Sequence, residues 1–408
     1  MRHKSEAAPV EDAAQETLLT ASVEAARPDA IDRLCLAFGD TPLALVALFI
    51  SPEADFHQTV TKAQDIFAPA RVLACTTAGE ISETGYTEGM IVAIGMPADR
   101  FAVEVMVVTD LTAGHDLRLI DRTIRHRETL SHCAPDWPHE FAFLLVDGLS
   151  LKEDELAFAL AAGLGKIPLF GGSAGDGSRF EKTFVSFDGE ILQNAAVVTF
   201  VRTRCPVEVF SLNHLQPTDR RMVVTRADPS RRIVHEINTE PAAREYARIL
   251  GHNPDGLGAF TFASHPIVVT IGGNSHVRAI QRVTEDGDLV FFSAIDEGLV
   301  LTLAEPEDLV AHLKSEFSAL STLKKPDAIL ACDCILRRLE AGQLQKLGNV
   351  SQVLRENRVI GFSTYGEQLN AMHVNHTMTG VALYPPDSDA ARSGSAHDEM
   401  ADRSERLA

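Results

Sequence analysis

The sequence predicts an α/β protein made of two multi-stranded mixed α/β domains. Continuous apolar runs that suit buried strands alternate along the chain with segments whose apolar residues recur at helical spacing. Glycine-rich turns follow several of the predicted strands. The chain has 408 residues, of which 45% are apolar and 23% charged, as in ordinary globular proteins with full-sized cores.

Strands and helices alternate through the first half. Leu43 to Ile50 is a continuous apolar run, typical of a strand buried on both faces. The segment 55–67 has helical spacing and ends before Pro69, and two more helices are expected at 116–133 and 153–164. The other strands predicted for this half are 72–75, 90–96, 101–108, 141–146, 168–170, 183–187 and 195–201.

A change of composition at 202–206 indicates a domain boundary, so we expect domains at 29–202 and 203–384. Beyond it, 241–250 is a predicted helix with proline in its first turn and Gly251 as its stop. The further strands expected here are 207–212, 222–225, 267–271, 277–283, 289–294 and 328–332, and the further helices are 305–321 and 336–347.

The two ends of the chain are rich in Ala, Glu and Asp and poor in large apolar residues. Such segments cannot bury enough apolar surface to offset the entropy lost on ordering. We therefore expect tails without a fixed fold at 1–28 and 385–408.

The charge balance excludes two classes of partner. Lys and Arg number 37 against 57 Asp and Glu, a net charge of −20, which disfavours nucleic acid and anionic membranes.

No apolar run near twenty residues occurs and no secretory signal opens the chain, so we expect a cytoplasmic protein. The six scattered cysteines do not form a disulfide framework and are expected to be reduced.

A short turn motif recurs after predicted strands: Ser or Thr, any residue, Gly, then an acid. It occurs at 77–80, 173–176 and 364–367, and the second interval is about twice the first. A degenerate fourth copy at 272–275 falls near the vacant position. This spacing predicts two halves, each built from two related units, and the alternative is chance recurrence in a glycine-rich chain.

The stretch from Gly361 to Gly380 is the first candidate site. In the extended run that follows its glycine turn, His373, Asn375 and Thr377 alternate and would share one face. A polar row of this kind predicts a lined pocket, and the alternative is an edge strand with a solvated polar face.

Several other chemistries were weighed. Residues 171–175 satisfy the Gly-x-Ser-x-Gly letters of a serine hydrolase around Ser173, but no convincing helix follows. Zinc at Cys332, Cys334, His373 and His376 is disfavoured because His-x-x-His in an extended run splits its rings to opposite faces. His214 stands where a strand leaves the core, and its imidazole is either structural or an axial ligand for haem iron.

Together these motifs resemble the FIST-domain sensory proteins over residues 35–384, with 29–202 as the N-type and 203–384 as the C-type half. The segments that carry this resemblance are 73–80, 217–225, 237–238, 241–242, Tyr246, 366–367 and 375–377. Three features are similar to the haem-binding, nitric-oxide-sensing branch (NosP): His214 before Pro217, the segment 332–340 and the segment 372–380. His376 departs from the Gln expected there.

The resemblance implies a haem-based nitric oxide sensor without enzymatic activity. Its partner would be a histidine kinase or a cyclic-di-GMP synthase or phosphodiesterase, and a second copy of the chain is also an option. One haem b would lie in the C-terminal half with His214 as first and His373 as second choice of iron ligand. Cys-x-x-Cys-His is absent from the sequence, which excludes the usual covalent attachment of c-type haem.

Four further residues are assigned around this haem. Asn375 and Thr377 would tune the bound gas, and Arg337 or Arg338 would pair with a propionate, unless these arginines form a surface ion pair with Glu340. Two alternatives to the haem sensor stay open. One is a FIST domain that binds a small polar ligand, such as an amino acid, between the glycine turns and the Asn375 row. The other is hydrolysis through Ser173.

Overall fold

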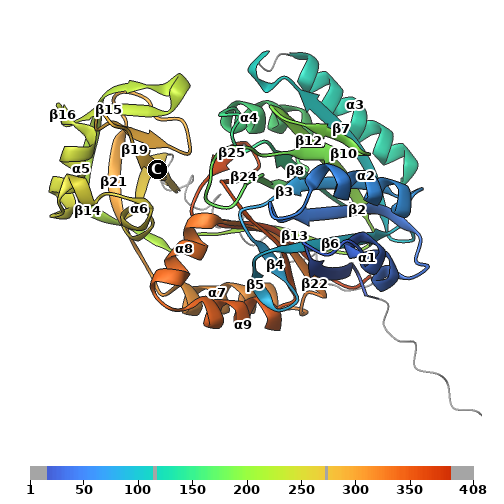
Figure 1. Ribbon diagram of the computed structural model, residues 1–408. Coiled ribbons are helices and arrows are strands. Elements are labelled where there is room, and N and C mark those ends of the chain that lie inside the picture. The colour runs from blue at the N-terminus through green and yellow to red at the C-terminus, as the bar shows by residue number, and fades with distance from the viewer. Residues whose placement is uncertain (1–15, 114–116, 272–273, 387–408) are drawn as a thin grey trace, which may run out of the picture.

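Three six-stranded sheets surround one apolar core, and an eight-stranded lobe stands beside this body (Figure 1). The computed structural model describes residues 16–113, 117–271 and 274–386. The predicted mixed α/β fold class is confirmed. Within the described ranges, no helix combines the length and the apolar character needed to span a membrane.

The body consists of three units with the same order of elements: strand, helix, strand, helix, strand, hairpin, strand. The first unit comprises β1 (Leu19–Glu24), α1 (Ala30–Phe38), β2 (Leu43–Ile50), α2 (Phe56–Phe67), β3 (Arg71–Thr76), the hairpin β4 (Glu80–Ser82) and β5 (Gly85–Thr87), and β6 (Met90–Pro97). The second comprises β7 (Phe101–Thr109), α3 (Leu117–Cys133), β8 (His139–Val146), α4 (Glu153–Leu164), β9 (Leu169–Ser173), the hairpin β10 (Val185–Phe187) and β11 (Glu190–Leu192), and β12 (Ala195–Thr203).

The third unit repeats this order with two helices before its last central strand. It comprises β13 (Val207–Leu212), α7 (Leu309–Leu320), β22 (Ala328–Cys334), α8 (Ile335–Gln343), α9 (Leu347–Glu356), β23 (Val359–Thr364), the hairpin β24 (Glu367–Leu369) and β25 (Met372–Val374), and β26 (Met378–Leu383). The body therefore contains three units of the same architecture, not the expected two pairs. Of the expected fourth copy, residues 272–273 lie outside the described part of the chain.

The three units interlock through their hairpins. In each unit the two central strands are parallel, and the last strand returns antiparallel beside the first of them. Each hairpin extends the sheet of another unit: β4 pairs with β23, β10 with β3, and β24 with β9. The exchange forms a closed cycle, because the first unit gives its hairpin to the third, the second to the first and the third to the second. Each sheet therefore contains strands of two units.

The apolar run of β2 shows why its residues are buried on both faces. Leu45, Ala47 and Phe49 point into the central core, whereas the alternate residues pack beneath α1 and α2. At the centre, Phe49 stacks on Phe362 with ring centroids 4.5 Å apart and meets the edge of Phe143 at 6.4 Å. One aromatic ring from each sheet thus closes the core.

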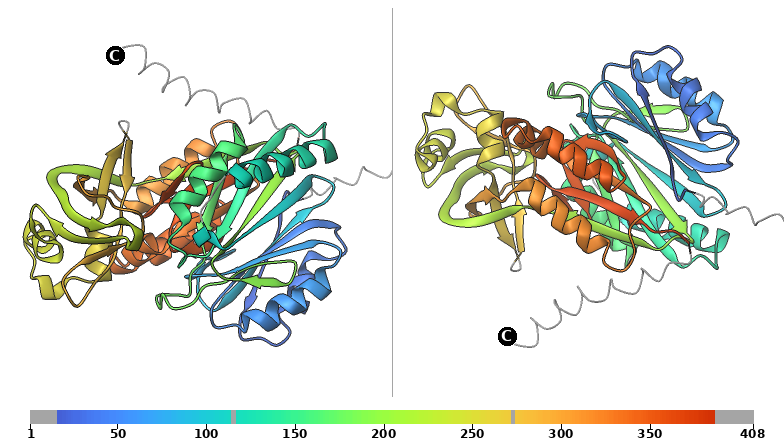
Figure 2. Two further views of the ribbon diagram at one scale, coloured as in Figure 1. Left: turned by 90° about the horizontal axis from the view of Figure 1, so that it is seen from above. Right: turned by 90° about the horizontal axis from the view of Figure 1, so that it is seen from below.

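The lobe is an insertion between β13 and α7 (Figure 2). It comprises β14 (Leu215–Asp228), β15 (Ile233–Ile237), β16 (Glu240–Pro241), α5 (Ala242–Leu250), α6 (Ala259–Ser264), β17 (Ile267–Ile271), β18 (Asn274–Val277), β19 (Ile280–Val283), β20 (Leu289–Phe291) and β21 (Val300–Pro306). Its two connections to the body run side by side, because the amide of Glu307 donates to the carbonyl of His214 at 2.8 Å. This crossing forms the hinge between lobe and body.

Some boundaries differ from the predictions. The expected tail 1–28 is wrong for its described part, because β1 pairs with β6 and buries Leu18, Ala21 and Val23. Residues 1–15 and 387–408 of the expected tails lie outside the described ranges. The predicted boundary at 202–203 separates the second unit from the third along the chain, but the sheets are shared across it.

Replacing Phe49 by Ala should lower the free energy of unfolding by about 3–5 kcal/mol, because the aromatic triple contact is lost and a cavity remains. Chemical denaturation followed by circular dichroism would measure the change. As a control, Phe158 on α4 is 73% exposed, and Phe158→Ala should change stability by less than about 0.5 kcal/mol. Equal effects of the two substitutions would contradict a core closed at Phe49.

Candidate functional site

The three recurring turns meet at one end of the body. They follow β3, β9 and β23 and are joined by backbone hydrogen bonds: the amide of Ser363 donates to Gly79 at 2.7 Å, and that of Ser173 to Gly366 at 2.8 Å. Ala78 and Tyr365 of these turns pack against Ala263 and Phe292 of the lobe. Ligand sites in α/β proteins commonly lie at the carboxyl ends of parallel strands, and this end is the one that the lobe covers.

All three turns end in a buried acid, and in two of them a threonine of the same turn donates to it. The hydroxyl of Thr77 donates to Glu80, and that of Thr364 donates to Glu367. Burial nevertheless raises the pKa of Glu80 to about 7 and that of Glu367 to about 8. Neither carboxyl group was among the predicted site residues. Both are the last residue of the recurring turn motif, and this shared position in the sequence could have indicated them.

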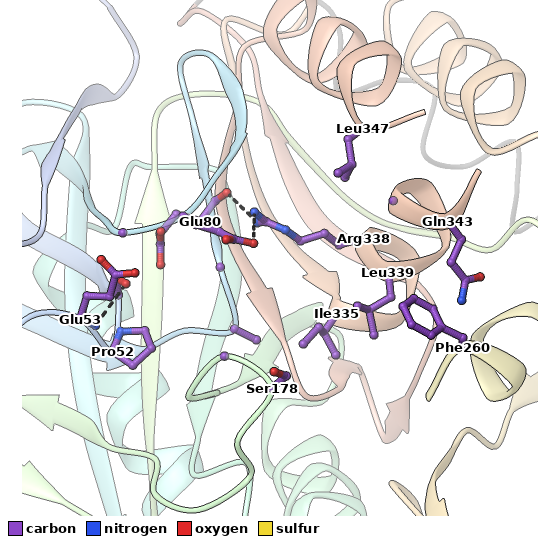
Figure 3. A pocket seen from close by; sticks show the side chains of 17 residues that line it. Pro52, Glu53, Glu80, Ser178, Phe260, Ile335, Arg338, Leu339, Gln343 and Leu347 are labelled. Atoms are coloured by element: carbon purple, nitrogen blue, oxygen red, sulfur yellow. Dashed lines mark hydrogen bonds and ion pairs between the residues drawn. The ribbon is translucent and has the colours of Figure 1, made fainter. Parts of the chain in front are cut away.

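A cavity of about 730 Å³, which we call cavity 1, opens beside the first turn (Figure 3). Its walls come from all three units and from the lobe: the segments 51–53, 78–80 and 88–89, Gly177 and Ser178, α8, Leu347 at the start of α9, and Phe260 of the lobe. Figure 3 shows the apolar side chains of α8 and Phe260 on one side and Glu53 on the other. The cavity thus spans the junction between body and lobe.

Arg338 lies in the polar wall of cavity 1. It donates to the carbonyl of Thr87 at 2.9 Å and to the carboxylate of Glu88 at 3.1 Å. Gly79 makes room for it, since a Cβ there would lie 2.4 Å from Arg338 Nη1 and the glycine has a φ of +125°. The structure therefore places this predicted propionate partner at a ligand-sized cavity, where it is held by the segment after β5.

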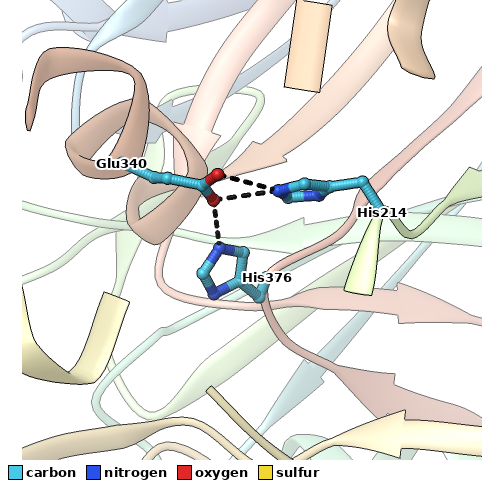
Figure 4. Close-up of side chains that lie close together, drawn as sticks. All are labelled: His214, Glu340 and His376. Carbon is cyan, nitrogen blue, oxygen red and sulfur yellow. Dashed lines mark hydrogen bonds and ion pairs between the residues drawn. The ribbon is translucent and has the colours of Figure 1, made fainter. Parts of the chain in front are cut away.

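His214 is the centre of a buried hydrogen-bond network at the hinge (Figure 4). Its Nε2 lies 2.9 Å from Oε2 of Glu340, and the same carboxylate oxygen lies 2.9 Å from Nε2 of His376. On the other side, Nη1 of Arg337 lies 3.0 Å from Nδ1 of His214. All four side chains are buried.

The protonation state of His214 follows from its partners. A guanidinium can only donate, so Nδ1 of His214 accepts from Arg337 and Nε2 carries the proton that Glu340 accepts. Burial, together with the charge of Arg337, lowers the pKa of His214 to about 4 despite Glu340. Burial opposes the ionisation of Glu340, but the hydrogen bonds from the two histidines outweigh it and lower that pKa to about 2.

His214, Glu340 and His376 also form a compact set of metal-ligating side chains, with ligand atoms within 4.8 Å of one another. A metal on Nε2 of His214 would require Nδ1 to hold the proton and donate it. Arg337 faces that nitrogen with a donor instead. The residues present therefore do not fit a metal ion on Nε2 of His214, and the three side chains are joined by hydrogen bonds instead. Nδ1 of His376 and Nη2 of Arg337 have no hydrogen-bond partner among the described residues.

The surroundings of the two histidines predicted as iron ligands do not fit a haem. His214 has both ring nitrogens engaged and is buried, and His373 is 2% exposed. Neither lines cavity 1, nor a second cavity of about 640 Å³ between lobe and body. The described residues that line these two cavities include no histidine, cysteine, methionine or tyrosine to ligate iron.

The predicted polar row is broken. His376 adopts a left-handed conformation with a φ of +56°, so the extended run ends at Val374 and alternation stops. Thr377 donates to Glu367 at 2.7 Å, and Asn375 accepts from Ser293 of the lobe. His373 lies 3.1 Å from the side-chain amide of Gln368.

The polar side chains of His373 and Asn375 converge beside one glycine. A Cβ on Gly366 would lie 2.3 Å from Cε1 of His373 and 2.7 Å from Nδ2 of Asn375, so this position requires glycine. Nε2 of His373 and Nδ2 of Asn375 have no hydrogen-bond partner among the described residues. The stretch singled out from the sequence is therefore a buried polar contact with the lobe.

The remaining predicted residues have structural partners. Arg337 is fully buried and donates to Asp333 at 2.7 Å, which also accepts from Tyr86 of the exchanged hairpin. The alternative of a surface ion pair with Glu340 is wrong, because Glu340 is buried and bound to the two histidines. The contacts of Glu340 with His214 and His376 were not predicted, because these residues come from α8, from the segment after β13 and from the segment before β26, and no local sequence pattern joins the three.

Ser173 lacks the surroundings of a hydrolase nucleophile. It is buried, and its hydroxyl accepts from the side-chain amide of Gln368 at 3.0 Å. The residues after it, 174–184, form turns and bends with no helix. The strand-turn-helix geometry that exposes a nucleophilic serine is thus missing here.

Fold and site together define a protein whose ligand-sized cavities lie between a three-unit body and an inserted lobe. Two family models match most of the chain: the FIST N domain over residues 44–240 and the FIST C domain over residues 242–370. The chain belongs to the FIST family, whose domains indicate a signal-transduction sensor. The two matched regions meet inside the lobe, not at the predicted boundary of 202–203.

One curated relative is an uncharacterized protein of Methanocaldococcus jannaschii, to which the chain is 26% identical over 275 residues. The aligned part covers 59% of this chain and 53% of the relative, so the match spans about half of that protein's length.

Glu367→Gln should alter the pH dependence of stability. A carboxyl group whose pKa is higher in the folded state adds to the free energy of unfolding. This contribution is complete below the unfolded pKa of about 4.3 and is lost as the pH rises through the folded pKa of about 8. Wild type should therefore lose about 3–5 kcal/mol relative to the variant between pH 5 and pH 9. Denaturation at a series of pH values measures this difference.

Exposed Glu356 on α9 provides the control for this series. Glu356→Gln should leave the shape of the pH profile unchanged. Parallel profiles for wild type and Glu367→Gln would contradict a buried, proton-binding carboxyl group at position 367.

Proposed function

We propose that this chain is a signalling sensor that binds a small amphipathic amine, such as an amino acid, in cavity 1. The observation that carries the proposal is that the cavity has walls on both sides of the hinge, from the body and from Phe260 of the lobe. A molecule bound there contacts both parts at once. It would therefore favour one arrangement of lobe and body over others, as a sensor requires.

The walls of cavity 1 favour a ligand with a positive charge and an apolar group. Three carboxyl groups line it, those of Glu53, Glu80 and Glu88, against one guanidinium, that of Arg338. Arg338 is paired with Glu88, so an ammonium group meets the exposed carboxylate of Glu53, and the buried carboxyl group of Glu80 adds negative charge behind this wall. The apolar part of the ligand would pack on Ile335, Leu339 and Phe260. This proposal is the polar-ligand alternative from the sequence, moved from the Asn375 row to the first turn.

The finer sensory assignments stay predictions. A haem b with nitric oxide as its ligand, and membership of the NosP branch, rest on the sequence resemblance alone. A histidine kinase or a cyclic-di-GMP enzyme as partner and a binding rather than catalytic role rest on the same ground, whereas the expected cytoplasmic location rests on the pattern of apolar residues in the sequence. The amine proposal has the support of a described cavity with suitable walls.

Three matched ligands would test the chemistry: L-leucine, isopentylamine, which lacks the carboxylate, and isovalerate, which lacks the amine. Calorimetry at pH 8 should show binding of the two amines and none of isovalerate. Glu80→Gln should weaken isopentylamine binding about tenfold, since the negative charge behind the cavity wall is lost. Because the pKa of Glu80 is about 7, affinity of wild type for isopentylamine should rise between pH 6 and pH 8.

Glu356→Gln serves as the matched control and should bind isopentylamine as wild type does. Preference for isovalerate, or equal binding by wild type and Glu80→Gln, would overturn the amine proposal. Haem titration tests the haem site expected from the sequence: we expect wild type to show no Soret maximum that is lost in His214→Ala. A Soret maximum lost in that variant would instead establish His214 as the iron ligand.

A further inference from the structure

A second cavity, which we call cavity 2, lies on the other side of α6 from cavity 1. It encloses about 640 Å³ between the lobe and the second unit, whose segment 148–151 and residues Arg179 and Phe180 form one wall. The short helix α6 separates the two cavities, because Phe260 lines cavity 1 and Phe262 lines cavity 2. Cavity 2 therefore also spans the junction of lobe and body.

The floor of cavity 2 is aromatic and packed in place. Four phenylalanines line it: Phe180, Phe262, Phe291 and Phe292. Phe180 stacks on Tyr365 with ring centroids 4.3 Å apart and lies 5.7 Å from the ring of Phe292. Phe262, Phe291 and Phe292 are buried and support the floor from within the core, whereas Phe180 is half-buried and is the ring that a planar ligand can contact. Because Phe180 is already fixed by its neighbours, that contact has a low cost in side-chain entropy.

The charge of cavity 2 is opposite to that of the whole chain. Arg179, Arg232 and Arg282 line it, and its described lining residues include no aspartate or glutamate, although the chain has a net charge of −20. Arg232 is committed to the protein, since it is buried and paired with Glu153 at 2.6 Å and Asp154 at 3.3 Å. Arg179 and Arg282 are exposed, and neither has an ion-pair partner in the described part of the chain.

From these observations we propose that cavity 2 binds a planar anion, an aromatic ring that carries a carboxylate or phosphate group. The ring stacks on the phenylalanine floor, and the anionic group takes the guanidinium groups of Arg179 and Arg282, which suit planar oxyanions. Cavity 1 is lined by three acidic residues and one arginine, and the ligand proposed for it carries the opposite charge. The two sites are thus chemically distinct, and the proposal for cavity 2 does not depend on the amine site.

Three naphthalene probes test the proposal on the full chain: 2-naphthoate, 2-naphthyl phosphate and 2-naphthylmethylammonium. Fluorescence titration should show binding of the two anions and at least tenfold weaker binding of the ammonium probe. The stronger of the two anions identifies the acid group that the site prefers. Increasing salt from 50 to 500 mM should raise the Kd of the anions, because the arginines are exposed to solvent.

The variants assign binding to cavity 2. Arg179→Gln and Arg282→Gln should each raise the Kd of the preferred anion about tenfold, and Arg282→Glu should shift preference toward the ammonium probe. Exposed Arg355 on α9 lines neither cavity, and Arg355→Gln should bind as wild type does. Thermal melts check that every variant is folded.

Two results would overturn the proposal: equal binding of anionic and cationic probes by wild type, or anion binding that survives in the Arg179→Gln/Arg282→Gln double variant. Isopentylamine binding at cavity 1 is measured on the same variants and should be unchanged. If wild type binds the anionic probes but does not bind isopentylamine, the proposal for cavity 1 is wrong and that for cavity 2 stands.

Discussion

The central core imposes the main constraint on this molecule, because three sheets must enclose it and no unit completes its own sheet. Phe49, Phe143 and Phe362 meet there, one from each sheet. Each sheet gains its last two strands from a neighbouring unit, which fixes the units at defined positions relative to one another. That arrangement brings the three Ser/Thr-x-Gly-acid turns together at the end that the lobe covers. The positions of both cavities follow from this placement.

The lobe is joined to the body by buried polar contacts as well as by apolar packing. His214 at the hinge is held by Glu340 and Arg337, Asn375 accepts from Ser293, and Arg232 is paired with Glu153. Buried polar groups of this kind are costly to leave unpaired, so a change in the lobe's position must exchange these partners together. Such a junction favours discrete arrangements, and a ligand between lobe and body can select among them.

Local patterns were sufficient to predict much of the fold but little of the site. The apolar run of β2, the helical spacing of α2 and the span of α4 were read correctly, because burial on one or two faces leaves a periodic signal. The repeated turn was also visible, yet its arrangement in three interlocked units depends on pairings between distant segments such as β4 and β23. His214 and His376 were noticed singly. Their shared partner, Glu340, is 126 residues from His214 and 36 from His376, and sequence spacing does not reveal such a contact.

The exchange of hairpins also affects how the chain must be made. While the ribosome has released only the first unit, the inner face of its sheet has neither the β10–β11 hairpin nor the other two sheets to cover it. β26, which supplies Val381 and Leu383 to the core, emerges near the end of synthesis. Apolar faces of the nascent chain are therefore exposed through most of translation, a state that favours aggregation and is normally shielded by chaperones. For the same reason, a fragment cut between units would carry an unfinished sheet, whereas the lobe enters and leaves through adjacent strands, and its excision would leave every sheet of the body whole.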